Sequence, residues 1–284
     1  MAGNFREQSI NLGRFDSDNR SREDQSAMTP LPRLEMVRLR VRDLDACVDF
    51  YTRKLGFHVA AILPAQVLLS SAPDSPPILE LDGDPAAAPT SPERAGLFHA
   101  AILLPGRPEL ANWVRHAANA GAEFEGFADH GVSEAAYLAD PEGNGLEFYR
   151  DRPRAQWPFR GGRLAMTTLP LDVRGLLADA SANEELPLAG ACWGHLHLSV
   201  TNLTRSQAFY ERELGLTCTQ DDYPGARFLA AGGYHHHVAI NVWRRARLPW
   251  RKGGAGLAGV VFSSGETPDR ELRDPEGIPL LVRG

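Results

Sequence analysis

The sequence repeats itself over long segments. VRDLDACVDFYTRKLGF at 41–57 reappears as VTNLTRSQAFYERELGL at 200–216, at a constant offset of 159 residues. A second pair, DPEGNGLEFY at 140–149 and DPEGIPLLV at 274–282, is offset by 134 residues. Because a repeated sequence indicates a repeated structural unit, we predict two related halves. Each half has room for two modules, so four modules are expected in all.

Each module is predicted to form a strand, a helix and then further strands. In the first module, residues 36–41 alternate like a half-buried strand. Asp43 can cap the following helix, and Gly56 can end it. The second module shows the same order of patterns: a strand at 97–105, a helix at 108–120 and strands near 123–128, 133–139 and 145–149. The fourth module, about 255–284, is too short for a helix and is therefore predicted to be eroded.

The repeats also suggest domain boundaries. Residues 1–32 are polar, carry both charges and are expected to form a disordered arm. The expected organisation is a first domain at 33–150 with modules one and two, a linker at 151–190 with a short helix near 171–179, and a second domain at 191–284 with modules three and four.

Composition narrows the functional classes. The net charge of −6 argues against a general nucleic-acid binder, which needs a basic surface. No apolar run approaches the length of a membrane span, so no membrane partner is expected. Three widely spaced cysteines fit neither a disulfide framework nor a thiolate metal site and suggest a reducing cytoplasm. Because the eroded fourth module leaves part of a sheet uncovered, a homo-oligomer is a further expectation.

Aligning the modules reveals a candidate metal site. Two positions are compared, one on the first strand and one on the last strand of each module. In module order, the first-strand residues are Met36, His99, His195 and Gly259, and the last-strand residues are Glu80, Glu147, Asn241 and Leu281. The separations are 44 residues in module one, 48 in module two and 46 in module three. Only modules two and three supply histidines, and with Glu147 they offer the two imidazoles and one carboxylate that bind Fe(II).

Several longer motifs carry a family resemblance. FHAAILLP, DHGVSEAAYLADPEGNGLEFYRDRPR, MTTLPLD, GHLHLSV and AGGYHHHVAIN resemble the two-domain extradiol catechol 2,3-dioxygenases of the vicinal oxygen chelate superfamily. The resemblance covers about 34–284 and is best over 96–243. It implies an α+β fold in which repeated βαβββ modules form two mixed-sheet half-barrel domains around a metal cavity.

The resemblance also implies roles for individual residues. His99, His195 and Glu147 match the metal ligands, with Fe(II) as the cofactor and Mn(II) as the other metal that accepts this set. His236 matches an acid–base histidine. Tyr137 matches a tyrosine that hydrogen-bonds the substrate, and His130 matches a supporting histidine. The implied reaction inserts O2 into a catechol and yields a 2-hydroxymuconic semialdehyde-type product. Modules two and three would then share one cavity, and modules one and four would form a metal-free counterpart.

The triple histidine 235–237 leaves a choice open. Strand alternation places His235 and His237 on the side of Asn241, with His236 opposite. The family motif favours His236, with His237 as the next candidate. His197 has the parity of His195 and is expected on the cavity wall or bonded to a neighbour. The cavity rim is expected to draw on 220–234 and on the linker.

Other interpretations compete with this one. His99 could be a packed core histidine, Glu147 a solvated carboxylate, Tyr137 a packed aromatic and His130 a loop cap. A glyoxalase-like isomerase or an epoxide-opening transferase would instead pair modules one and two and use Glu80, His99 and Glu147. A metal-free binding protein on the same scaffold is a third possibility.

Overall fold

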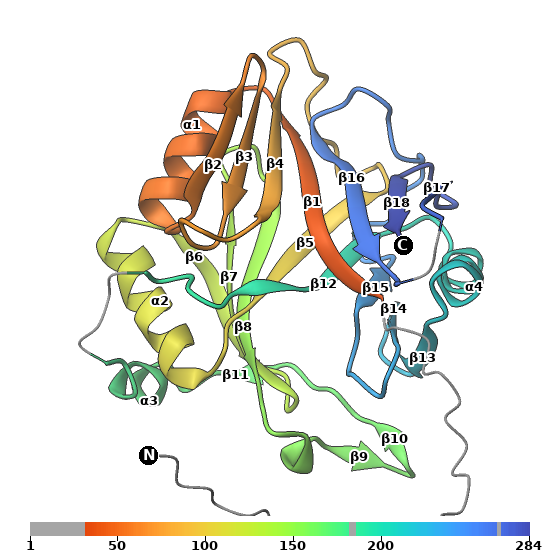
Figure 1. Cartoon of the computed structure of the whole chain (residues 1–284). Helices are drawn as coiled ribbons and strands as arrows, with labels where there is room; N and C mark the ends of the chain where they lie inside the picture. The colour runs from red at the N-terminus through yellow and green to blue at the C-terminus, as the bar shows by residue number, and fades with distance from the viewer. Residues whose placement is uncertain (1–31, 182–185, 266–267) are drawn as a thin grey trace, which may run out of the picture.

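The computed structural model describes residues 32–181, 186–265 and 268–284. The disordered arm predicted at 1–32 therefore lies, except for its last residue, outside the described residues. In Figure 1 the helices α1, α2 and α4 lie on the outside of the molecule and the strands run between them. The fold is α+β, consists mostly of strands, and curls its sheets into half-barrels, as expected.

The first two modules follow the predicted order of elements. Module one contains β1 (Arg33–Val41), α1 (Leu44–Asp49) with a π-helical continuation (Phe50–Lys54), β2 (His58–Leu63), β3 (Gln66–Ser70) and β4 (Pro77–Gly83). Module two contains β5 (Gly96–Leu103), α2 (Arg107–Asn119), β6 (Phe124–Asp129), β7 (Ser133–Ala139) and β8 (Gly145–Asp151). The Asp43 side chain accepts a hydrogen bond from the Ala46 backbone N–H and so caps α1 as predicted.

The connection and the last two modules complete the chain. The connection contains a 3-10 turn (Arg154–Gln156), β9 (Phe159–Arg160), β10 (Arg163–Leu164), β11 (Leu169–Pro170) and α3 (Val173–Ala178). Module three contains β12 (Cys192–Ser199), α4 (Leu203–Leu214), β13 (Thr217–Gln220), β14 (Ala226–Ala230) and β15 (Val238–Asn241). Module four contains β16 (Gly256–Ser263), β17 (Arg270–Arg273) and β18 (Pro279–Arg283), with no helix among its described residues.

Two large sheets combine the modules in an order that the chain does not follow. Modules two and three form a nine-stranded sheet in the order β11-β6-β7-β8-β5-β12-β15-β14-β13. Modules one and four form a seven-stranded sheet in the order β17-β18-β16-β1-β4-β3-β2. The antiparallel pairs β5·β12 and β1·β16 join the modules within each sheet. The predicted pairing of module two with module three is therefore confirmed.

Strand alternation separates a helix-covered face from an open face in the nine-stranded sheet. Leu146 and Phe148 on β8 belong to the main core, where the Phe148 ring stacks on Trp113 of α2 at 3.6 Å between centroids. Glu147, between them, points to the opposite face because successive side chains of a strand alternate. The same alternation on β12 puts Leu196 in the core and its neighbour His195 on the open face.

The repeated sequence motifs contact one another within each half of the chain. The Tyr51 hydroxyl donates to Asp140 Oδ2 at 3.1 Å, and the equivalent Tyr210 hydroxyl donates to Asp274 Oδ2 at the same distance. In each half, then, a tyrosine of the first repeated segment reaches the aspartate of the second. These bonds tie module one to module two and module three to module four. The sheets instead pair modules across the halves, so every module is held to two others.

Candidate metal centre

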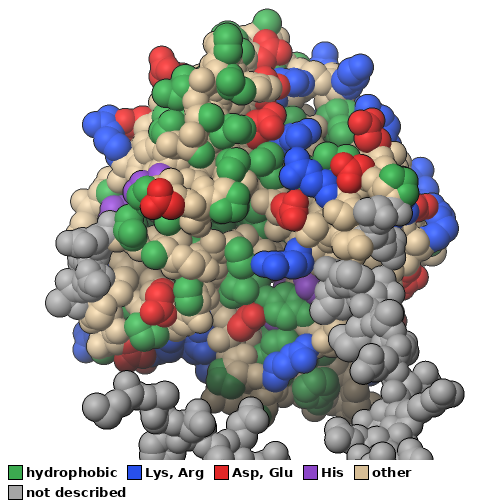
Figure 2. Space-filling model, viewed as in Figure 1, with side chains coloured by type: hydrophobic (Ala, Val, Ile, Leu, Met, Phe, Trp, Pro, Cys, Tyr) green, Lys and Arg blue, Asp and Glu red, His purple; other side chains and the backbone are tan. Residues whose placement is uncertain are grey.

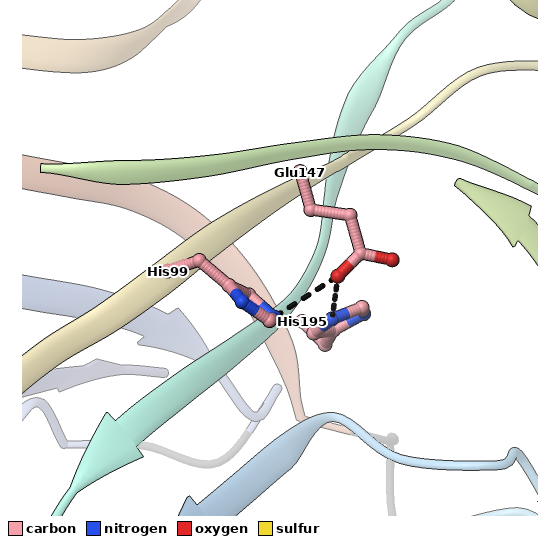
Figure 3. A group of neighbouring side chains, drawn as sticks. All are labelled: His99, Glu147 and His195. Carbon is pink, nitrogen blue, oxygen red and sulfur yellow. Dashed lines mark hydrogen bonds and ion pairs between the residues drawn. The ribbon is translucent and has the colours of Figure 1, made fainter. Parts of the chain in front are cut away.

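Three adjacent strands bring the predicted metal ligands together. Glu147 on β8 and His195 on β12 both lie directly across from Ala101 on the central strand β5. His99 lies two residues before Ala101 and therefore points to the same face. Figure 3 shows the three side chains converging from their separate strands. Tyr137 extends this row, because it lies across from Glu147 on β7.

The ligand atoms of the cluster are close enough to share one ion. Glu147 Oε2 lies 2.9 Å from His99 Nε2 and 3.1 Å from His195 Nε2. One ligand atom from each residue lies within 4.8 Å of the others, and all three residues are buried. This is the only such group of three or more candidate ligands among the described residues.

The electrostatics of the cluster favour a bound cation. Burial raises the pKa of Glu147, but the adjacent His195 and His99 lower it more, and it lies well below its ordinary value. Burial lowers the pKa of His195 to about 4, against the opposing effect of Glu147. Both shifts favour an ionised carboxylate beside a neutral imidazole, the forms that bind a metal. Among the described residues no Lys or Arg pairs with Glu147, so a divalent cation fits this donor set and its buried negative charge.

Close packing next to His195 requires a glycine. A Cβ atom on Gly194 would lie 1.8 Å from the hydroxyl oxygen of Tyr149, which is fully buried. Without a side chain, Gly194 leaves room for the Tyr149 hydroxyl beside the candidate ligand. The GH pair of the GHLHLSV motif therefore has a packing reason as well as a chemical one.

His130 and Tyr137 form a hydrogen-bonded pair beside the cluster. His130 Nδ1 lies 2.7 Å from the carbonyl oxygen of Thr167, and His130 Nε2 lies 2.7 Å from the Tyr137 hydroxyl. The carbonyl can only accept, so Nδ1 donates to it, and Nε2 then accepts from the Tyr137 hydroxyl. Burial, and then the charge of Glu147, raise the pKa of Tyr137 well above its ordinary value, which keeps its hydroxyl protonated.

The three consecutive histidines have different surroundings. The His236 ring lies 4.0 Å from the His195 ring and lines the cavity that contains the cluster. His235 is fully buried behind it. His237 lines a different cavity, together with Asp151 and Tyr234, and accepts a 3.3 Å hydrogen bond from the Ala231 backbone. The structure thus groups His236, but not His237, with the other candidate site residues.

The cluster opens into a cavity of about 400 Å³, a size that suits a small organic molecule. Most of its wall is apolar or aromatic. Residues of the linker and of 220–234 contribute to the wall as expected: Met166, Thr167, Thr168, Tyr223 and Phe228.

Sequence reasoning missed part of this wall. Phe98, Trp243 and Arg244 also line the cavity. Phe98 neighbours His99 on β5, so simple alternation assigned it to the opposite face and gave no reason to expect it in the cavity. Trp243 and Arg244 follow the last strand of module three, where no pattern applies. His197 lies on the wall as its parity indicated, and its Nε2 has no hydrogen-bond partner among the described residues.

The strand register corrects one assignment in the module alignment. The last-strand residue lies across from the residue two after the first-strand position in module one (Arg38↔Glu80), in module two (Ala101↔Glu147) and across β16·β18 (Val261↔Leu281). In module three the same rule pairs His197 with Ala239, so the prediction of Asn241 was wrong by two residues. The correct spacing is 44 residues, as in module one, and module three places a methyl group where module two places Glu147.

The alternative ligand set is not assembled. Glu80 lies on β4 of the seven-stranded sheet, where it pairs with Arg38 at 3.2 Å. His99 and Glu147 belong to the nine-stranded sheet. A site built from Glu80, His99 and Glu147 would require modules one and two to share a sheet, which they do not.

Repeated modules that share a sheet around a cluster of two histidines and one glutamate define a class of metal-binding enzyme folds. A family model for the Glyoxalase/Bleomycin resistance protein/Dioxygenase superfamily matches residues 33–148. A catechol-2,3-dioxygenase of Bacillus subtilis is 40% identical over 243 residues, which is 84% of this chain and 83% of that protein. A biphenyl-2,3-diol 1,2-dioxygenase of Rhodococcus globerulus is 30% identical over 126 residues, 44% of this chain and 66% of that protein.

Solved structures show the same fold at low sequence identity. Glyoxalase I of Zea mays superposes with a TM-score of 0.53 at 17% identity, covering 88% of this chain and 92% of that chain. A structure from Bacillus subtilis superposes with a TM-score of 0.58 at 12% identity, covering 89% and 84%. The chain therefore belongs to the glyoxalase/bleomycin resistance protein/dioxygenase superfamily, in which it is an extradiol dioxygenase-like oxidoreductase.

Two further observations concern the charge on the surface and the character of the helices. Figure 2 shows acidic and basic side chains interspersed on the face in view, with hydrophobic side chains between them. Within the described ranges, none of the helices combines the length and the apolar character that crossing a membrane requires.

Proposed function

We propose that the protein is a ring-cleaving dioxygenase that opens a catechol-type substrate beside its two hydroxyl groups. The observation that carries this proposal is the convergence of His99, Glu147 and His195 from three adjacent strands into one cavity. Fe(II) is the proposed metal, and Mn(II) suits the same ligands. Such a metal supplies Lewis acidity and a centre for reaction with O2.

His236 is the proposed acid–base residue. It is buried in the cavity wall beside His195, and burial, followed by the neighbouring imidazoles, lowers its pKa well below the ordinary value. It is therefore neutral at physiological pH and able to accept a proton from a substrate hydroxyl. A positioned base of this kind contributes about 10²- to 10⁴-fold to a rate.

Tyr137 and His130 are proposed to orient the substrate. The Tyr137 hydroxyl donates its hydrogen bond to His130. The lone pairs of the tyrosine oxygen therefore remain free to accept a hydrogen bond in the cavity. The Thr167 carbonyl fixes the far side of His130. The apolar wall, with Phe98, Phe228 and Trp243, suits an aromatic ring and excludes water from it.

The proposed product is a 2-hydroxymuconic semialdehyde-type compound, formed when the ring opens next to the diol. We also propose that the protein works in the cytoplasm, since its three cysteines are free thiols.

Metal analysis and oxygen uptake test this proposal together. The protein is purified anaerobically, its metal content is measured, and O2 consumption and product absorbance are followed with catechol. We expect about one Fe or Mn per chain and a yellow product, both lost in His195→Ala. His58→Ala is the matched control, because His58 lies on β2 of the other sheet and should retain both. Metal without O2 uptake from any catechol would contradict the reaction, and absence of metal would contradict the site.

A further inference from the structure

A line of hydrogen-bonded groups leads away from the cavity behind His236. His236 Nδ1 lies 2.7 Å from His235 Nδ1, and His235 Nε2 lies 2.8 Å from Asp151 Oδ1. The two histidines are buried, whereas the Asp151 side chain is 26% exposed. Asp151 ends β8, the strand that also carries Glu147, and faces the second cavity with Trp157 and Tyr234.

Counting protons along this line determines the direction of each bond. An ionised carboxylate only accepts, so His235 Nε2 carries a proton and donates it to Asp151. A neutral imidazole has one N–H, which leaves His235 Nδ1 as an acceptor. His236 must therefore donate from its own Nδ1. The nitrogen that remains, His236 Nε2, then carries a lone pair.

The packing around His235 holds this arrangement in place. The ring of Tyr234 lies 4.0 Å from the His235 ring, and Trp157 lies at 5.4 Å on another side. A ring that is packed and hydrogen-bonded at both nitrogens has no freedom to reverse, so its neighbour has none either.

We propose that Asp151 and His235 are positioning residues that hold His236 in its Nδ1-protonated tautomer, with the Nε2 lone pair ready to accept a proton in the cavity. The inference rests on the proposed function for the role of His236 toward substrate, but the tautomer itself does not depend on it. Which ring nitrogen of a histidine carries the proton is determined by the bond that the other nitrogen makes. Without Asp151, nothing fixes the direction of the remaining bond between His235 and His236.

The first test is spectroscopic. Two-bond ¹⁵N–¹H spectra of the full-length protein, labelled at histidine and loaded with diamagnetic Zn(II), distinguish the two neutral tautomers. The His236 signals are assigned as those that disappear in His236→Gln. We expect them to show the proton on Nδ1. In Asp151→Ala we expect a mixture with the Nε2-protonated form. An Nε2-protonated His236 in the unmodified protein, or a tautomer unchanged in Asp151→Ala, would overturn the proposal.

The second test is kinetic and uses catechol as substrate. Asp151→Ala is expected to lower kcat by about 10- to 100-fold, the usual effect of removing a supporting partner. KM and metal content should not change, since Asp151 lines the second cavity and not the one that contains the metal cluster, and no bond joins it to the candidate ligands. Asp151→Glu should recover part of the loss, because it restores the acceptor.

Arg154→Ala is the matched control. Arg154 lines the same second cavity and donates to the Gly232 carbonyl, but it takes no part in the line of bonds. Its kcat should stay within about twofold of the unmodified enzyme. An unchanged kcat in Asp151→Ala, or an equal loss in Arg154→Ala, would overturn the positioning role. If no catechol is consumed, the proposed function fails, and the spectra alone decide the tautomer.

Discussion

At the scale of single residues, the candidate site depends on which face of a strand each side chain occupies. Ala101 illustrates this point, because Glu147 and His195 flank it on the two neighbouring strands. Ala101 contributes only a methyl group between the two candidate ligands. Alternation along β5 then adds His99 to the same face, which the sequence predicted from the repeat.

The histidine run makes the same point and leads to a prediction. His236→Gln is expected to lower kcat by about 10²- to 10⁴-fold, because it removes the proposed base from the cavity. His237→Gln should cause a much smaller loss, since His237 faces the second cavity. Steady-state kinetics with catechol for the two variants decide between them. A larger loss in His237→Gln would reverse the assignment.

His195 should stay available to a metal at unusually low pH. An ordinary histidine is half protonated at pH 6.5, and its proton competes with the metal. Burial lowers the pKa of His195 to about 4, and the pKa of Glu147 is also lowered, so both stay deprotonated in weak acid. We expect protonation of His195 to weaken Zn(II) binding only between pH 5 and pH 4. Calorimetric titrations at pH 7, 5 and 4 measure the Zn(II) affinity, and complete loss of binding above pH 5 would be the contrary result.

At the scale of elements, the repeated turns explain why the repeats are so similar. Glu142 accepts from the backbone of Arg42 and Asp43, at the start of α1. Its repeat partner Glu276 accepts from the backbone of Thr201, at the start of α4. The DPEG turn of one module therefore holds the helix start of another. Both segments of this contact recur because the contact itself recurs.

The buried aspartate of the second turn should affect stability with a definite sign. Burial raises the pKa of Asp274 to about 6, although its hydrogen bonds oppose the shift. The folded protein thus holds this proton more tightly than the unfolded chain does, and stability decreases as pH rises from about 4 to 6. In Asp274→Asn this loss is absent, because the amide keeps the Oδ1 acceptor without the charge.

Urea unfolding at pH 4, 5, 6 and 7 measures the effect. From pH 4 to pH 7, the unmodified protein should lose up to about 3 kcal/mol of unfolding free energy relative to Asp274→Asn. Asp221→Asn is the control, because Asp221 is exposed. A difference that does not vary with pH would rule out this role for Asp274.

At the scale of the whole molecule, the candidate metal centre draws its residues from both halves of the chain. His99 and Glu147 come from one half, and His195 and His236 come from the other, joined by the β5·β12 pair. We expect the fragment 33–181 alone to bind metal weakly and to consume no O2. Co-expression with 186–284 should restore both, because the two large sheets reassemble. Metal content and O2 uptake of the fragments and the pair test this, and an active single fragment would be incompatible with the shared site.

Much of this architecture could be predicted from the sequence. The repeat predicted the modules, their helices and the lack of a helix in the fourth. The family motifs selected the residues His99, Glu147 and His195, which the structure brings together. Local patterns suffice here because alternation, caps and turns depend on neighbouring residues.

Other features depended on contacts that no local pattern encodes. The register of β15 replaced Asn241 with Ala239, because a shift of two residues preserves alternation and leaves no trace in the sequence. Tertiary packing also places His236 and His237 in different cavities and brings Asp151 within hydrogen-bond distance of His235. The sequence by itself determined which residues could form the site, since residue types and periodicity are local. Only the tertiary structure decided which of them meet, because pairing between distant strands is set by the packing of the whole chain.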